Sequence, residues 1–291
     1  MARKPLKKIL ILGSSGMLGS MVYDYFKKDH KLFVEATTRN KKDKTKRYFE
    51  VNNFLEIKHK YSYLKTYDYI INCIGAIKFT ENQKNIYNAI KVNSLFPHEL
   101  SSFLNKSKTK IIQIATDCVF SGKNGAYNES FEHDDSSVYG KTKSLGEVNN
   151  DNFLNIRCSI IGPEKLRSKN LMQWVLSQKN DSVIQGFSDY KWNGVTTLQF
   201  AKLCSSIINR NMFNKIRKIN HTHHYVPNNS TSKYELVKMI SEIFEKKIKV
   251  IKVKKFNKPI NRTLSSRYKI LQLITGKSTI KGEVLKLKYE K

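Results

Sequence analysis

The feature that most constrains the fold of this chain is a short apolar run that ends abruptly in a glycine-rich turn. Residues 9–12 read Ile-Leu-Ile-Leu, and glycines stand at positions 13, 16 and 19. A run that is apolar at every position is typical of a strand buried on both faces of a parallel sheet. Glycines allow the tight turn and the close backbone approach that follow such a strand. The sequence therefore predicts a strand–turn–helix unit near its start.

Similar apolar runs recur through the first half of the chain. Between them lie segments long enough for helices, and in the second of these Ile90 and Leu95 belong to the expected buried stripe. The expected strands are 32–36, 69–74, 110–115 and 153–158, and the expected helices are 17–27 and 85–104. Strands that alternate with helices predict a doubly wound α/β fold with a parallel sheet over residues 1–160.

After about residue 160 the pattern becomes more helical. We expect helices at 171–178, 198–208 and 232–246, the last begun by a capping box of Ser232 and Glu235. Residues 247–255 alternate Ile and Val with Lys, as in a strand with one solvated face. We therefore predict a smaller, discontinuous C-terminal substrate lobe over 161–291, with some segments returning to the first domain.

Charge and composition exclude several classes of function. The chain carries 53 Lys and Arg against 24 Asp and Glu, a formal net charge of +29. These lysines are spread along the whole sequence, so we interpret them as a solvated surface and expect no nucleic-acid partner. The four cysteines, at positions 73, 118, 158 and 204, lie too far apart to indicate a zinc site or a disulfide framework.

The basic segment from Met1 to Lys8, followed by apolar residues, superficially resembles a secretory signal. Glycine interrupts the apolar run after four residues, and no later run approaches the length of a membrane span. We therefore expect a cytoplasmic protein without a membrane span.

The glycine turn also has a chemical use. Free N–H groups and the positive end of the following helix favour a pyrophosphate, although an ordinary strand-to-helix turn is the alternative. The fingerprint of NAD binding expects an acid about 20 residues on, but residues 37–40 read Thr-Thr-Arg-Asn. Arg39 can pair with a 2′-phosphate, unless the basic residues here only reflect the general lysine excess. The sequence therefore predicts NADP(H), with NAD(H) as the other cofactor it could use.

A tyrosine and a lysine provide candidate acid–base chemistry. Tyr139 and Lys143 are four residues apart and would share one face of a helix. The expected strand at 110–115 delivers the hydroxyl of Thr116 to the carboxyl edge of the sheet, where open α/β sheets bind ligands. These three residues are our catalytic candidates, and a solvated helix face is the alternative interpretation of the pair.

These motifs together resemble the extended short-chain dehydrogenase/reductases and, within them, the dTDP-4-dehydrorhamnose reductase family. The resemblance lies in the turn at 13–19, in Ala-Thr-Asp-Cys-Val-Phe-Ser-Gly at 115–122, and in Tyr-Gly-Lys-Thr-Lys-Ser-Leu-Gly-Glu at 139–147. Looser matches at 72–76, 155–159, 232–235 and 262–266 extend it over nearly the whole chain. It implies a Rossmann fold and NADPH-dependent reduction of the 4-keto group of a nucleotide-activated 6-deoxysugar, in surface polysaccharide synthesis.

The resemblance also implies roles for individual residues. Tyr139 would donate a proton to the carbonyl oxygen, Lys143 would favour the phenolate and hold the nicotinamide ribose, and Thr116 would bind the same oxygen. The implied cofactor-binding residues are Gly13, Gly16, Met17, Leu18, Arg39, Glu50, Val51, Gly75, Ala76, Tyr139 and Lys143. The expected substrate contacts are Thr116, Asp117, Asn193 and Arg262, the last on the diphosphate.

Departures from the family pattern keep alternatives open. Cys118 stands where the family usually has Tyr, Ala115 where it has Ser, and Ile160 where it has an aromatic residue. GDP-L-fucose synthase, a related enzyme, has a Cys at this offset and uses it to epimerise the sugar before reduction. A non-catalytic NADP-binding regulatory subunit is a further alternative. The sugar, the nucleoside diphosphate, the product's stereochemistry and the formation of a homodimer stay open.

Two further features have two interpretations each. The segment His-Thr-His-His at 221–224 is metal-like, but alternating side chains on a strand need not converge, and we expect no metal. The acidic loop at 122–137 is either a mobile flap beside the site or a solvated connection.

Overall fold

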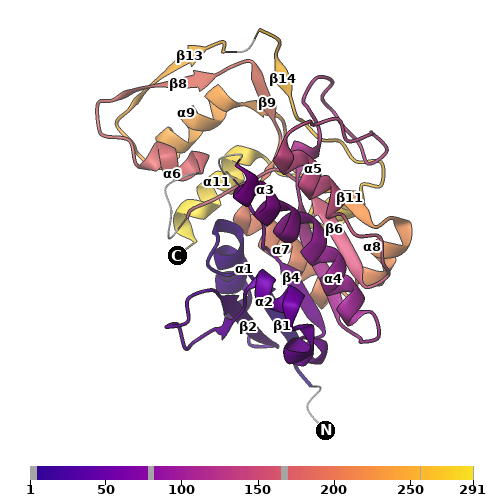
Figure 1. Cartoon of the computed structure of the whole chain (residues 1–291). Coiled ribbons are helices and arrows are strands. Elements are labelled where there is room, and N and C mark those ends of the chain that lie inside the picture. Colours follow the sequence, from indigo (N-terminus) through magenta and orange to yellow (C-terminus); the bar gives the residue numbers. More distant parts are fainter. Residues whose placement is uncertain (1–4, 78–81, 165–169, 256, 291) are drawn as a thin grey trace.

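The larger part of the molecule is built on one seven-stranded parallel sheet with the order β3-β2-β1-β4-β5-β6-β11 (Figure 1). The computed structural model describes residues 5–77, 82–164, 170–255 and 257–290, so Met1 to Lys4 of the basic start lie outside the described residues. The strands are β1 (Lys7–Leu12), β2 (Leu32–Thr38), β3 (Arg47–Tyr48), β4 (Tyr69–Asn72), β5 (Lys110–Ala115), β6 (Phe153–Arg157) and β11 (Thr222–His224). The predicted doubly wound fold is confirmed, with its reversal of strand order between β1 and β4.

Helices cover both faces of this sheet because side chains alternate along each strand. Ile9 and Ile11 of β1 belong to one buried cluster, and Leu10 and Leu12 belong to the other. The first cluster includes residues of α1 (Met17–Lys27), α7 (Thr197–Asn209), α8 (Phe213–Ile219) and α10 (Ile270–Thr275). The second includes residues of α2 (Val51–Glu56), η1 (Lys58–Thr66) and α4 (Phe96–Leu104).

The predicted helix at 85–104 is present, and Ala89 and Leu100 of its expected stripe are buried, but two other residues of that stripe are not. It consists of α3 (Gln83–Ala89), the π-helical turn η2 (Ile90–Leu95) and α4. Ile90 and Leu95, expected inside, are exposed, while Asn93 and Ser94 are buried. A π turn holds more residues than an α turn, so it rotates the face that follows. The prediction for Ile90 and Leu95 was wrong for this reason.

A smaller group of elements follows residue 160 and lies beyond one end of the sheet in Figure 1. Its parallel pair is β8 (Val183–Phe187) with β13 (Lys249–Val253), and its three-stranded sheet has the order β12-β9-β14. The remaining bounds are β9 (Tyr190–Trp192), β12 (Thr231–Ser232), β14 (Ile260–Asn261), α6 (Leu171–Leu176), α9 (Lys233–Ile243), α11 (Ile280–Tyr289), β7 (Ile160–Ile161) and β10 (Val195–Thr196). The capping box of Ser232 and Glu235 begins α9, as predicted.

Chain segments from both halves of the sequence contribute to the large sheet. Strand β11 is an outer strand of it and pairs in parallel with β6. Helix α7 packs on α1 through side chains that include Val22 and Ile207. The boundary at residue 160 stays a prediction. Among the described residues, no helix combines the length and the apolarity needed to cross a membrane.

Candidate active site

The glycine turn is held in a conformation that side chains would oppose. Gly13 has φ +79°, in the left-handed region that favours glycine. A Cβ on Gly19 would lie 2.2 Å from the carbonyl oxygen of Gly13, so the first turn of α1 can only pack this closely on the loop without one. The backbone N–H of Gly13 donates to Thr37 Oγ1 at the end of β2, at 3.1 Å. The turn is therefore fixed between β1, β2 and α1.

The start of α1 fits a phosphate group. Gly16 is the N-cap residue, no side chain caps this helix, and its first turn contains no acidic residue. The helix has 11 residues, enough for its N–H groups and dipole to favour an anion near Met17 and Leu18. A Cβ on Gly16 would come no closer than 3.5 Å to the Gly13 carbonyl oxygen, an ordinary van der Waals contact, so Gly16 is not held in a tight approach as Gly19 is. The residues present fit the pyrophosphate of a dinucleotide.

Other predicted cofactor residues lie at the carboxyl ends of neighbouring strands. Arg39 directly follows β2 and is exposed, as a contact to a 2′-phosphate requires. Glu50 is the N-cap of α2 and accepts a hydrogen bond from the Tyr48 hydroxyl at 2.7 Å, and Val51 is the first residue of that helix. Strand β3 ends at Tyr48, so Glu50 and Val51 stand at the start of the helix that follows it.

Asn93 joins two parts of the site that the sequence left separate. Gly75 and Ala76 follow β4, and the main chain of Ala76 donates to Asn93 Oδ1 at 2.8 Å. Asn93 Nδ2 donates to the carbonyl of Ala76 at 3.0 Å and to Thr142 Oγ1 at 3.2 Å. The π turn is what directs this side chain inward. Asn93 thereby ties the loop after β4 to α5 (Val138–Leu145), which carries Tyr139 and Lys143.

Thr116 and Tyr139, two of the predicted catalytic residues, lie close together. Thr116 directly follows β5, and its hydroxyl accepts the main-chain N–H of Cys118 at 3.2 Å and lies near enough to Tyr139 to influence the pKa of the phenol. Burial is the main cause that raises the pKa of Tyr139, with a further rise from Cys118 and Asp117 and an opposing effect from the Thr116 hydrogen bond. The phenol is therefore protonated at neutral pH, which suits a proton donor.

Lys143 lies on the same helix, and its ammonium bonds to the backbone of β5. Its side chain is buried, and its ammonium donates to the carbonyl of Ile114 at 3.1 Å. Burial lowers the pKa of Lys143 to about 8, against opposing effects of Glu147 and Cys73. In this structure burial dominates the pKa of Tyr139 and raises it, so the expected stabilisation of the phenolate by Lys143 stays a prediction. The pKa of Tyr139 is raised because the phenol is desolvated, while the ammonium of Lys143, also desolvated, bonds to the backbone.

The predicted substrate residues Asp117 and Arg262 lie beside Thr116. Asp117 is buried, and this burial raises its pKa while Arg262 and Lys233 oppose the rise. Arg262 Nη1 donates to Cys118 Sγ at 3.2 Å. Burial and the neighbouring Asp117 raise the pKa of Cys118 to about 12, so this cysteine is a thiol rather than a thiolate at neutral pH.

The smaller lobe supplies residues that the sequence did not single out. The ammonium of Lys233 lies 4.8 Å from the centre of the Tyr190 ring, and the Tyr190 hydroxyl hydrogen-bonds Arg262. Tyr190 and Lys233 carried no local motif beyond the loose match at 232–235. Asn193, by contrast, uses its side-chain amide to hold the main chain of Leu264, donating at 2.8 Å and accepting at 2.9 Å. Through these two bonds Asn193 has a structural role beside the site, because it fixes the main chain at Leu264.

The histidines at 221–224 do not converge. The ring of His223 bonds to the carbonyls of Ile216 and Asn220, whereas that of His224 lies between Arg157 and the carbonyls of Tyr127 and Ser265. Among the residues that the structure describes, no group of His, Cys, Asp and Glu side chains could hold a metal ion.

The acidic loop at 122–137 is tied down along its length. Tyr127 is buried and stacks on Phe120 with ring centres 4.3 Å apart. Glu129 accepts the main-chain N–H groups of His224 and Arg267. Asp134 accepts from the main chain of Ser121. In this structure these contacts anchor the loop to its surroundings, and its mobility stays a prediction.

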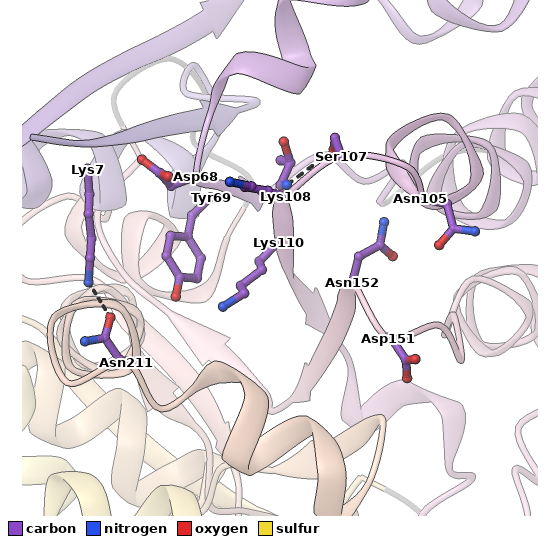
Figure 2. A pocket seen from close by; sticks show the side chains of 11 residues that line it. Lys7, Asp68, Tyr69, Asn105, Ser107, Lys108, Lys110, Asp151, Asn152 and Asn211 are labelled. Carbon is purple, nitrogen blue, oxygen red and sulfur yellow. Dashed lines mark hydrogen bonds between the residues drawn. The ribbon is translucent and has the colours of Figure 1, made fainter. Parts of the chain in front are cut away.

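A cavity of about 550 Å³ lies at the opposite edge of the sheet (Figure 2). It is lined by residues at or before the amino ends of β1, β4, β5 and β6, including Lys7, Tyr69 and Lys110. Because parallel strands end together, Thr116, Gly13 and Gly75 stand at the other edge. This cavity is separate from the candidate active site.

Comparisons with known proteins agree with this geometry. The family model described as "RmlD substrate binding domain" matches residues 7–280. A dTDP-4-dehydrorhamnose reductase from Clostridium acetobutylicum has the same fold, with a TM-score of 0.76 and 22% identity over 97% of this chain and 98% of that one. The corresponding enzyme from Bacillus anthracis, in complex with NADP, gives a TM-score of 0.77 and 16% identity over 99% and 100% of the chains.

A curated relative has a different description. "Methionine adenosyltransferase 2 subunit beta" from Bos taurus is 24% identical over 257 residues, which cover 82% of this chain and 73% of the relative. The family model, in contrast, extends over most of the sequence and over both parts of the fold. The chain therefore belongs to the RmlD substrate-binding-domain family.

Proposed function

We propose that this protein is an NADPH-dependent reductase of the 4-keto group of a nucleotide-activated 6-deoxysugar, acting in deoxysugar and surface polysaccharide synthesis. The observation that carries the proposal is the adjacency of the Thr116 hydroxyl and the Tyr139 phenol at the carboxyl edge of the sheet. This edge also holds the phosphate-binding turn at the start of α1. A protonated phenol, a second hydroxyl and a dinucleotide site are what a carbonyl reduction needs.

Three residues of this chain have separate roles in the proposed reaction. The bound NADPH would supply the hydride. Tyr139 donates its phenolic proton to the carbonyl oxygen, and Thr116 hydrogen-bonds that oxygen and orients it. Lys143 holds the nicotinamide ribose, and its ammonium favours the phenolate that remains after proton transfer. Desolvation of the site strengthens each of these interactions.

The cofactor preference rests on Arg39. An exposed guanidinium directly after β2 can pair with a 2′-phosphate, and no acidic residue replaces it at this position. The Bacillus anthracis neighbour is described in complex with NADP, and a UDP-glucuronic acid 4-epimerase neighbour from Bacillus cereus with NAD. We expect NADPH to give the lower KM and NADH to be a poorer donor. A lower KM for NADH would contradict the assignment of Arg39.

The substrate side combines a diphosphate with a sugar. Arg262 and Lys233 bring two cations from the smaller lobe close to Asp117, which suits a dianionic diphosphate. Arg262→Ala should therefore raise the KM for the sugar nucleotide. An unchanged KM would remove Arg262 from the substrate contacts.

The decisive experiment is NADPH oxidation with a panel of dTDP-, GDP- and UDP-linked 4-keto sugars. Tyr139→Phe keeps the ring and its packing but removes the proton, so kcat should fall by about 10²–10⁴-fold while NADPH binding persists. Fluorescence titration with NADPH measures that binding separately. A Tyr139→Phe protein with near wild-type turnover would overturn the mechanism.

Two alternatives give different outcomes in the same assays. The bovine relative is described as a subunit of methionine adenosyltransferase, which favours a non-catalytic NADP-binding subunit as second candidate. That candidate predicts NADPH binding without turnover of any sugar in the panel. Epimerisation through Cys118 predicts deuterium on the ring carbons beside C4 when product is made in D₂O. We expect no such label, because the Cys118 pKa of about 12 leaves little thiolate.

A further inference from the structure

Asp135 occupies a bridging position between the catalytic helix and the smaller lobe. It lies in the loop before α5, and 9% of its side chain is exposed. One carboxylate oxygen, Oδ1, accepts the main-chain N–H of Ser137 at 2.9 Å and also the hydroxyl of Ser137. The other oxygen, Oδ2, accepts from Nη2 of Arg262 at 3.0 Å. Each oxygen therefore binds a different part of the protein.

The Oδ1 side fixes the start of the helix that carries Tyr139. Ser137 is the N-cap of α5, and its hydroxyl accepts the main-chain N–H of Gly140 at 3.1 Å. A Cβ on Gly140 would lie 2.4 Å from Asp135 Oδ1, so the carboxylate packs directly against the first turn. Tyr139 stands between Ser137 and Gly140 in this turn. The direction of its side chain follows the position of the cap.

The Oδ2 side fixes Arg262, which in turn contacts the segment of Thr116. Besides Asp135, the guanidinium donates to Cys118 Sγ at 3.2 Å and to the carbonyl of Ser121 at 3.4 Å. Cys118 donates its own main-chain N–H to Thr116 Oγ1. A continuous chain of bonds thus runs from the Thr116 segment through Arg262 and Asp135 to the cap before Tyr139.

We propose that Asp135 is a positioning residue, which through its ion pair with Arg262 couples the smaller lobe to the relative placement of Thr116 and Tyr139. The pair is largely withdrawn from water, with 20% of the Arg262 side chain exposed, so it is screened less than a surface pair. A misplacement of about 1 Å between reacting groups can cost about 100-fold in rate. The kinetic part of this inference rests on the proposed function; the coupling itself does not.

The first test is a double-mutant cycle that needs no substrate. Asp135→Asn keeps an oxygen for the cap and removes the charge, and Arg262→Gln removes the opposite partner. Urea unfolding gives the free energy of unfolding of both single variants and of the double variant. If the two residues are coupled, the double variant should lose about as much of this free energy as the more damaging single variant does. Hydrogen exchange at residues 137–141 should accelerate in Asp135→Asn. Additive losses with unchanged exchange would overturn the inference, whatever the activity of the enzyme.

The second test separates positioning from general structural damage. Asp135→Asn should lower kcat for the 4-keto sugar nucleotide by roughly tenfold to 100-fold and leave the KM for NADPH unchanged. Asp135→Glu, which keeps the charge, should recover part of that loss. Glu132→Gln removes an exposed carboxylate from the same loop and should match the wild type. Equal kcat values in all these variants would contradict a positioning role.

The two failures are distinguishable. If the wild-type protein reduces no 4-keto sugar, but the double-mutant cycle shows coupling and hydrogen exchange is faster in Asp135→Asn, the proposed function is wrong and the coupling is supported. If the wild-type protein is active, but the stability losses of Asp135→Asn and Arg262→Gln are additive, the proposed function is supported and the coupling is wrong.

Discussion

At the scale of single residues, Lys143 carries the clearest pH dependence. Burial lowers its pKa to about 8, so the ammonium is lost just above neutral pH. If this charge supports cofactor binding and the phenolate, kcat/KM should fall above pH 8, roughly tenfold per pH unit for a single proton. A pH profile of NADPH oxidation tests this. Lys141→Met, an exposed lysine of the same helix, should leave the profile unchanged, and a wild-type profile that stays flat to pH 9.5 would contradict the assignment.

The same lysine should also reduce the stability of the fold. Its native pKa lies below the reference value of 10.5, so the unfolded state binds the proton more strongly between pH 8 and 10.5. The cost of about 3 kcal/mol is therefore present at pH 7 and is relieved as the pH rises through this range. Lys143→Met keeps the volume and removes the charge, so thermal unfolding at pH 7 should occur at higher temperature while turnover is lost. A less stable variant would show that the bond to Ile114 outweighs the burial cost.

At the scale of elements, the contact between α1 and the glycine turn should tolerate no side chain at residue 19. In Gly19→Ala the Cβ would meet the backbone of Gly13, which cannot rotate away. The helix must shift, with an expected loss of about 1–3 kcal/mol in the free energy of unfolding. Because the shifted N–H groups no longer converge on a pyrophosphate, NADPH affinity should fall at least about tenfold.

A glycine in another helix provides the control for this variant. In Gly282→Ala the Cβ meets only the Thr279 hydroxyl, at 3.2 Å, and this N-cap side chain of α11 needs to move by only a few tenths of an ångström. Urea unfolding and NADPH fluorescence titration should show a small effect on stability and none on binding. If Gly19→Ala bound NADPH like the wild type, the close approach of turn and helix would not matter for the cofactor.

At the scale of the whole molecule, a buried polar network should make the fold sensitive to acid. Arg157 pairs with Glu147, and the two side chains are 3% and 6% exposed. The Nδ1 atom of His224 faces the carbonyls of Tyr127 and Ser265, and its Nε2 faces Arg157. This places a proton on Nδ1 and makes Nε2 an acceptor, so a second proton would put two cations together.

Burial, followed by the charge of Arg157, lowers the pKa of His224 to about 4, from 6.5. Between these values the unfolded state binds more protons, so stability should fall by about 3 kcal/mol as the pH drops from 6.5 to 4. Urea unfolding at several pH values measures how steeply the free energy of unfolding changes with pH. His224→Gln should reduce this slope, and His59→Gln, an exposed histidine of η1, should not. Equal slopes in both variants would assign the acid sensitivity to other groups.

Local sequence patterns determined the elements that form the scaffold. The apolar run at 9–12, the helix at 17–27 and the cap of Ser232 and Glu235 follow from periodicity, from the glycine turn and from capping chemistry, all of which operate within a few residues. For the same reason Thr116 could be assigned to the carboxyl edge of the sheet, since parallel strands end together, and Tyr139 to one helix face with Lys143. The family resemblance added roles to these positions, and the site residues await experiment.

Only the tertiary structure decided which side chains meet and in what state. The π turn buried Asn93 and exposed Ile90, against the helical period. Lys143 met a backbone carbonyl rather than the phenol, and Asp135 became a bridge to Arg262, 127 residues further along the chain. Contacts across such separations depend on how whole elements pack, and pKa values depend on burial that packing creates. A sequence pattern contains neither quantity locally, so it predicted the fold and the edge of the site but not its electrostatics.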